Sequence, residues 1–169
     1  AATKYDIQDA MNAYVGYGVP SSKLVLGVPA YGRSMKVASL NNYGLYQTVT
    51  GVPGGDNDDA SSGATGVFLY NCIINSAACN NNGSTIAALT FVNQGSAVFN
   101  QLSSQAQEPW AYGATPQGNI FLTYDNVATA TFKTQKVKAN GYGGVMVWEI
   151  DGDAVDDINM SLINAMKTE

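Results

Sequence analysis

An aromatic residue followed closely by carboxylates is the most informative feature of this 169-residue sequence. Trp148 ends an apolar run, and Glu149, Asp151 and Asp153 come directly after it. Aromatic side chains combined with carboxylates are suited to bind sugars. The apolar face of the sugar ring stacks on the aromatic ring, while the sugar hydroxyls form hydrogen bonds with the polar groups. The alternative is a core role, in which Trp148 fills space beneath the end of its strand. The acidic residues favour the sugar-binding interpretation.

Composition agrees with an uncharged, hydroxyl-rich ligand. Only 12% of the residues are charged, against about 25% in typical domains. The net charge of -5, from 8 basic and 13 acidic residues, disfavours nucleic acid and anionic membrane surfaces as partners. No apolar run approaches the length of a membrane span.

Several kinds of site are excluded by what the sequence lacks. There is no His, which removes His-based triads and imidazole metal ligands. Cys72 and Cys79 alone cannot form a four-ligand zinc site, so we expect neither a metal nor a cofactor. Six residues separate these cysteines. They could form a local disulfide in an oxidising compartment or remain free buried thiols.

Alternating helices and apolar strands are expected to position these residues. Asp6 is a candidate N-cap for a helix that Gly16 and Gly18 end. The apolar run 23–31 is typical of a parallel strand covered on both faces. Further along we expect a helix capped by Asp125, a strand over 144–150, and a short helix around Leu162, Ile163 and Met166.

Residues 35–118 are too long for a loop between a strand and a helix. We expect an α+β subdomain there, with strands at 67–70 and 86–92 between Asn- and Gly-rich turns. Trp110 and Tyr112, near its end, could be further stacking surfaces or part of its core.

Two segments resemble a known family. Residues 23–34 (KLVLGVPAYGRS) resemble the seventh-strand signature of family 18 chitinases, and residues 143–153 (GGVMVWEIDGD) resemble the eighth-strand signature. The spacing between them matches the insertion subdomain of that family. The resemblance implies the C-terminal part of a TIM (β/α)8 barrel, with residues 1–34 and 119–169 in the barrel and 35–118 as an inserted α+β subdomain.

The same resemblance implies that the family's catalytic residues are missing from this chain. Family members carry an Asp-x-x-Asp-x-Asp-x-Glu motif on the fourth strand and Met-x-Tyr-Asp on the sixth, and neither occurs here. Tyr124 and Asp125 follow the insertion and are expected to be structural. The family uses the acetamido oxygen of the substrate as nucleophile, so a Glu must still protonate the glycosidic oxygen. We therefore expect no catalytic residue in this chain and no activity from it alone.

Binding roles can be carried over residue by residue. The resemblance places Trp148 as the apolar floor under the sugar at the cleavage point and Tyr31 in the same pocket, unless Tyr31 only packs at the strand end. Tyr70 matches a Tyr that approaches the substrate, although Asn71 and Cys72 after it depart from the family pattern. From strand alternation, Glu149 is expected to point away from Trp148 and to pair with Arg33 at the rim.

Three hypotheses follow for the function. The chain could be part of a secreted, active chitinase that hydrolyses β-1,4-linked N-acetylglucosamine polymers, part of a chitin-binding protein without the acid, or an excised structural domain. Its ligand would be chitin or chitooligosaccharides. Because the sequence begins at Ala1 without an initiator Met or the apolar region of a signal peptide, we expect a processed or excised piece. Two strands of an eight-stranded barrel leave open edges, so the N-terminal part of the barrel or a domain-swapped copy is the expected partner.

Overall fold

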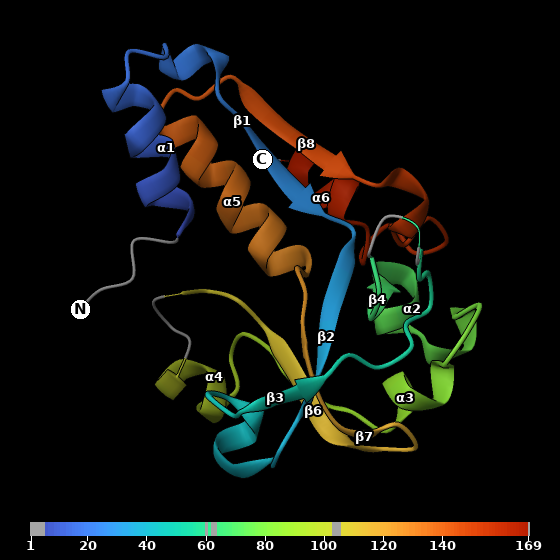
Figure 1. Ribbon diagram of the computed structural model, residues 1–169. Helices are drawn as coiled ribbons and strands as arrows, with labels where there is room; N and C mark the ends of the chain where they lie inside the picture. The colour runs from blue at the N-terminus through green and yellow to red at the C-terminus, as the bar shows by residue number, and fades with distance from the viewer. Residues whose placement is uncertain (1–5, 60, 62–63, 103–105, 169) are drawn as a thin grey trace.

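The computed structural model describes residues 6–59, 61, 64–102 and 106–168. Figure 1 shows a helical region built on two strands, joined to a second region that contains the other strands. The helices are α1 (Ile7–Gly16), α2 (Tyr70–Ile74), α3 (Gly83–Ala87), α4 (Ala97–Leu102), α5 (Val127–Ala139) and α6 (Leu162–Lys167). The strands are β1 (Val25–Pro29), β2 (Tyr31–Val37), β3 (Val49–Gly51), β4 (Val67–Leu69), β5 (Thr90–Val92), β6 (Trp110–Thr115), β7 (Gly118–Thr123) and β8 (Gly144–Trp148). Among the described residues, the helices are too short or too polar to span a lipid bilayer.

The first sheet consists of β1 and β8, which pair in parallel from Val25–Gly144 to Pro29–Trp148. Helices α1 and α5 lie along one side of this pair in Figure 1. Leu26 packs in that layer with Met11 of α1 and Val137 of α5. The apolar run predicted a strand covered on both faces. Buried and exposed residues alternate along β1, which shows that only the side facing the helices is covered in this chain.

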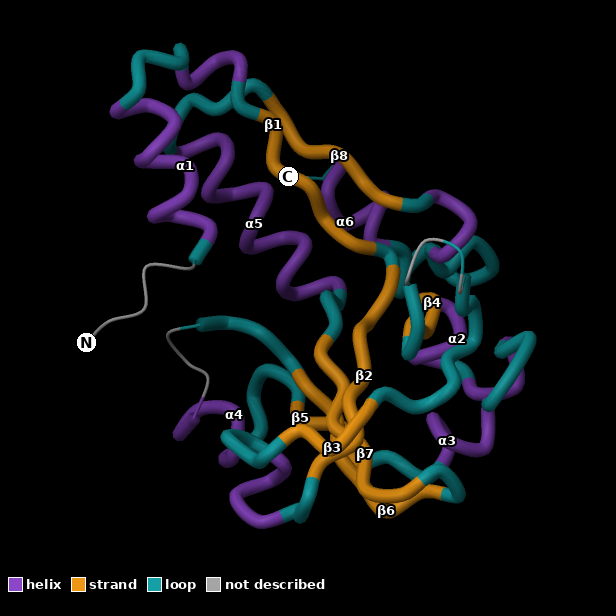
Figure 2. Tube along the Cα trace, in the orientation of Figure 1, coloured by secondary structure: helices purple, strands orange, loops and turns teal. Residues whose placement is uncertain are grey.

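The second sheet has the order β3-β2-β7-β6-β5, and β4 also pairs with β2. All of these pairs are antiparallel, and Figure 2 shows the strands gathered below β1 and β8. The predicted strand over 23–31 therefore divides at Ala30, where the chain leaves β1 and enters β2. Because residues 31–34 and 119–123 pair within this sheet, we propose Ala30 and Tyr124 as the limits of the insertion, in place of 35–118.

Local signals correctly predicted α1 and α6. The Asp6 carboxylate accepts a hydrogen bond from the backbone N–H of Asp9 at 2.7 Å and caps α1, and α6 lies where the short helix was expected. The cap of α5 was assigned to the wrong residue. Asn126 caps this helix in a capping box with Thr129, because the carboxylate of Asp125 is buried and bonded to Lys133.

The prediction of a strand over 86–92 was also wrong in part. Residues 83–87 form α3, and only 90–92 belong to a strand. Asn82 precedes α3 in the left-handed region, with φ of 54°, and its carbonyl accepts a hydrogen bond from the N–H of Thr85. Asn tolerates this conformation better than most residues, so the Asn-rich segment can lead directly into a helix. The pattern of apolar residues alone did not indicate this helix.

Candidate functional site

The open face of the first sheet carries the principal candidate residue. Trp148 is 62% exposed, and Val25 and Met146 on the same face are 54% and 48% exposed. Neighbours along β8 on the other face, Val145 and Val147, are half-buried against the helices. The predicted alternation along this strand is therefore present, and it leaves the indole of Trp148 accessible at the carboxyl end of β8.

Backbone bonds fix the position of Trp148 relative to the neighbouring strand. Its carbonyl accepts a hydrogen bond from the N–H of Ala30 at 2.8 Å, and the peptide bond between Trp148 and Glu149 is cis. Tyr31 lies next to Ala30 and is half-buried. The guanidinium carbon of Arg33 lies 5.6 Å from the centre of the Tyr31 ring. Trp148, Tyr31 and Arg33 therefore occupy successive positions where β8 and β1 end and β2 begins.

The predicted ion pair between Arg33 and Glu149 is not formed. Within the described ranges of the chain, the ion pairs that are present centre on Lys133. The reason is the division of the strand at Ala30: Arg33 enters the second sheet, where it is paired between Val67 of β4 and Thr123 of β7. It stays exposed there and contacts the Tyr31 ring instead.

The structure places Tyr70 in the core and not on the open face. Its side chain is completely buried in the main hydrophobic cluster. Burial raises the pKa of Tyr70, and the nearby carboxylates of Asp153 and Asp157 raise it further. A neutral phenol enclosed in this way cannot touch a sugar bound over Trp148 without a rearrangement of the core.

Asn71 is the residue beside Tyr70 that reaches the loop after Trp148. Its side-chain N–H donates to the carbonyl of Asp151 at 3.3 Å, while its side-chain oxygen accepts from the N–H of Cys72. The insertion is thereby linked to the loop that follows β8. Sequence analysis treated Asn71 only as a departure from the family pattern, because a contact across 80 positions leaves no local signal.

The acidic residues after Trp148 have different roles. Asp153 is buried, and its carboxylate accepts hydrogen bonds from the hydroxyl of Ser161 at 2.7 Å and the N–H of Leu162 at 2.8 Å. It therefore holds the start of α6. Asp151 is exposed and Glu149 is half-buried.

Two further candidates lie within the insertion. Cys72 and Cys79 are joined by a disulfide. Trp110 is buried and stacks against Phe99, with 6.4 Å between ring centres, and its indole N–H donates to the carbonyl of Tyr43 at 3.1 Å. Of the two alternatives for Trp110, the structure supports the core role.

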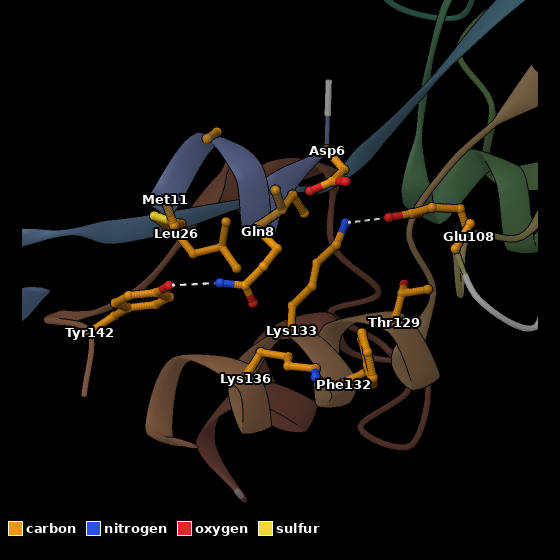
Figure 3. Close-up of a pocket in the computed structure, with 13 residues that line it drawn as sticks. Asp6, Gln8, Met11, Leu26, Glu108, Thr129, Phe132, Lys133, Lys136 and Tyr142 are labelled. Atoms are coloured by element: carbon orange, nitrogen blue, oxygen red, sulfur yellow. Dashed lines mark hydrogen bonds and ion pairs between the residues drawn. The ribbon is translucent and has the colours of Figure 1, made fainter. Parts of the chain in front are cut away.

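A cavity of about 970 Å³ lies between α1 and α5 (Figure 3). Met11 and Leu26 contribute apolar surface, and at one end the ammonium of Lys133 lies 3.0 Å from the Glu108 carboxylate. The same ammonium contacts both carboxylate oxygens of Asp125, at 2.7 and 2.8 Å. Neither Trp148 nor Tyr31 lines this cavity, so it is separate from the candidate sugar site.

Burial and charge act in opposite directions on Lys133. Burial alone would lower its pKa, but the carboxylates of Asp125 and Glu108 raise it above the ordinary value. For Glu108, burial and the charge of Asp125 raise the pKa and outweigh the opposing effect of Lys133. These residues join α5 to the segment that leads into β6, and the sequence pattern did not predict their association.

Comparison with known proteins gives consistent matches along the chain. A family model described as glycosyl hydrolases family 18 matches residues 1–153. Chitinase A1 from Niallia circulans is 30% identical over 169 residues, covering 99% of this chain and 20% of that protein. The crystal structure of a chitinase from Rhizomucor miehei superposes with a TM-score of 0.72 at 24% identity, over 95% of this chain and 42% of that one. Human YKL-39, described as a pseudo-chitinase with retained chitooligosaccharide binding, superposes with a TM-score of 0.67 at 26% identity, over 97% and 39% of the two chains.

These likenesses confirm the predicted fold class, part of a TIM (β/α)8 barrel with an inserted α+β subdomain. The parallel pair of β1 and β8, with α5 before β8, corresponds to neighbouring strands of such a barrel. The chain spans only 20% of the length of the Niallia protein and about two fifths of the two solved chains.

Proposed function

The chain belongs to glycosyl hydrolase family 18, and from that membership we propose that it is the C-terminal part of a secreted chitinase. In this proposal it supplies sugar-binding residues, while the Glu that protonates the glycosidic oxygen lies on another part of the barrel. The observation that carries the proposal is the accessible indole of Trp148 at the carboxyl end of β8, where active sites of such barrels lie.

The sugar would rest on Trp148. An exposed indole offers a flat apolar surface for the face of a pyranose ring. Tyr31 would add an aromatic contact and Arg33 a polar one. Tyr31 follows Ala30, whose backbone N–H bonds to the Trp148 carbonyl, and Arg33, which contacts the Tyr31 ring, would offer N–H donors to sugar hydroxyls or an acetamido carbonyl. No direct sugar contact is proposed for Tyr70, whose side chain is buried.

Hydrolysis would need an acid from outside these residues. A retaining, substrate-assisted reaction still requires one carboxylic acid within reach of the leaving oxygen. Asp153 is buried and accepts hydrogen bonds from the start of α6, Glu149 is half-buried, and Asp151 is exposed. The proposal assigns the acid to none of them, because the Asp-x-x-Asp-x-Asp-x-Glu motif that carries it in the family does not occur in this chain. The chain would thus contribute binding and orientation, and not proton transfer.

The unpaired edges of the first sheet support a partner that completes the barrel. Val25 and Met146 are exposed on its open face, and α1 exposes a second apolar surface with Tyr14 and Val15, 56% and 44% accessible. Soluble proteins rarely leave unpaired strand edges and large apolar surfaces exposed to solvent. The proposed occupant is the remainder of the barrel, and in its absence a second copy of this chain.

A chitin-binding protein without catalysis is the second candidate function. Human YKL-39, 26% identical here, is described as a pseudo-chitinase that retains chitooligosaccharide binding. The two candidates differ at the last residue of the fourth-strand motif, where Glu means an enzyme and another residue means binding only. Intact-mass analysis and sequencing of the native protein would identify that residue.

Replacing Trp148 with Ala tests the sugar platform. In a protein that contains the whole barrel, we expect affinity for chitooligosaccharides to fall by about 1 to 3 kcal/mol, a range taken from nucleobases stacked on aromatic side chains. Because Trp148 is the last residue of β8, at the carboxyl end where the barrel opens, the free energy of unfolding should fall by less than the roughly 3 to 5 kcal/mol lost when a buried Trp is truncated. Trp148→Phe, which keeps an aromatic face, is the matched control. Unchanged affinity with a collapsed melting temperature would assign Trp148 to the core.

The proposed partner surface predicts self-association of the isolated chain. Sedimentation velocity should show species larger than a monomer, and Val25→Lys with Met146→Lys should shift the distribution toward monomer. Val155→Lys is the control, because Val155 is 75% exposed but lies outside the first sheet. A well-behaved monomer in the unmodified chain, with no partner present, would count against the incomplete-barrel account.

A further inference from the structure

A short loop after β2 holds several residues in a backbone conformation that L-amino acids rarely adopt. Asn42, Tyr43, Gly44 and Tyr46 have φ values of 51°, 58°, 79° and 60°. Only Gly takes up this left-handed region without steric cost, so a Tyr there is unfavourable unless the surroundings impose it. Backbone strain of this kind concentrates at ligand-binding sites.

Polar contacts hold the loop of residues 41–47 in place. The side-chain amide of Gln47 donates to the carbonyls of Asn41 and Leu45, both at 3.0 Å. The buried indole N–H of Trp110, in β6, donates to the carbonyl of Tyr43. The ring of Tyr43 packs edge-on against Tyr112, with 5.9 Å between ring centres. The loop is therefore fixed at both ends and from the sheet beneath it.

This fixed loop presents Tyr46 to the solvent. The side chain of Tyr46 is 93% exposed, although an aromatic ring gains free energy from burial. Residues 38–50 carry no charged side chain, and Asn41 and Asn42 of the same loop are exposed. An accessible aromatic face among neutral hydrogen-bonding groups matches an uncharged sugar better than an ionic ligand.

We propose that the loop of residues 41–47 is a second carbohydrate platform, on which Tyr46 stacks against a sugar ring of an extended chitin chain. This inference rests on the proposed function, because it assumes the same class of ligand. The seven residues of β2 separate the loop from Tyr31 by about 20 Å at the usual rise per residue. A short oligosaccharide over Trp148 would therefore not reach Tyr46, whereas a polymer could contact both.

Depletion binding to insoluble chitin tests the proposal on the 169-residue chain. Tyr46→Ala should weaken binding to the polymer by about five- to hundredfold, the range expected from loss of one stacking contact. Tyr46→Phe should keep most of the binding. Tyr17→Ala is the matched control, because Tyr17 is 86% exposed but follows α1. Titration of chitotriose should give the same affinity for Tyr46→Ala as for the unmodified chain.

Tyr46→Gly separates binding from folding. Gly accepts the φ of 60° without cost, so the melting temperature should stay the same or rise while polymer binding falls. Polymer binding by Tyr46→Ala equal to that of Tyr17→Ala would overturn the platform. If Trp148→Ala still weakened binding in that case, the proposed function would stand without it. If the unmodified chain did not bind chitin at all, both proposals would fail.

Discussion

The 169-residue chain alone should hydrolyse chitotetraose no faster than buffer does. Protonation of the leaving oxygen by a positioned carboxylic acid contributes about 10² to 10⁴ to such a rate, and the mechanism of this family cannot proceed without it. Of the carboxylates that follow Trp148, Asp153 is buried and engaged in folding, and Glu149 and Asp151 do not belong to the motif that carries the acid in the family. Release of reducing ends, followed over days by chromatography, is the measurement.

A complete family 18 chitinase at the same concentration is the positive control for this assay. Turnover by the pure chain that Glu149→Gln abolishes would contradict both the missing acid and the assignment of Glu149 to a non-catalytic role. Turnover that survives Glu149→Gln would indicate a contaminating enzyme, and repeated purification would have to remove it.

Lys133→Met should lower the free energy of unfolding by about 3 to 5 kcal/mol, the cost of removing one partner from a buried ion pair. The Lys133 side chain is 10% exposed and that of Asp125 is 1% exposed, so the carboxylate left behind would have little access to water. Urea denaturation monitored by circular dichroism would measure the change.

Lys136→Met is the matched control, one turn further along α5. Its ammonium lies 5.3 Å from the exposed ring of Phe132, a contact worth about 0.5 to 1 kcal/mol at such a site. Adding Asp125→Leu to Lys133→Met should recover much of the lost stability, because the uncompensated charge is then removed as well. If Lys133→Met and Lys136→Met lowered the free energy of unfolding equally, the buried ion pair would contribute no more to stability than the exposed contact of Lys136.

Sequence reasoning predicted the parts of this fold that local patterns specify. The helix after Asp6, the two parallel strands and the exposed position of Trp148 follow from capping and from alternation along a strand. Each of these depends on residues within one element. The same holds for the family resemblance, whose two signatures are each contiguous in the sequence.

Features that depend on distant contacts were predicted poorly. Tyr70 was expected at the sugar site, but the packing of α2 into the main cluster buries it. Arg33 was expected to meet Glu149, but the chain changes sheets at Ala30 and carries Arg33 away. Lys133 contacts both Asp125 and Glu108, and so joins a helix to a segment that precedes β6.

Tryptophan fluorescence tests the central claim, that Trp148 is the sugar platform, most directly. The chain has two Trp residues, of which Trp148 is 62% and Trp110 is 3% exposed, so a ligand at the open face should affect only Trp148. We predict that chitotetraose shifts the emission to shorter wavelength in a saturable way, that Trp110→Phe keeps this response and that Trp148→Phe loses it. A response that persists in Trp148→Phe, or no response in the unmodified chain at saturating sugar, would contradict the account.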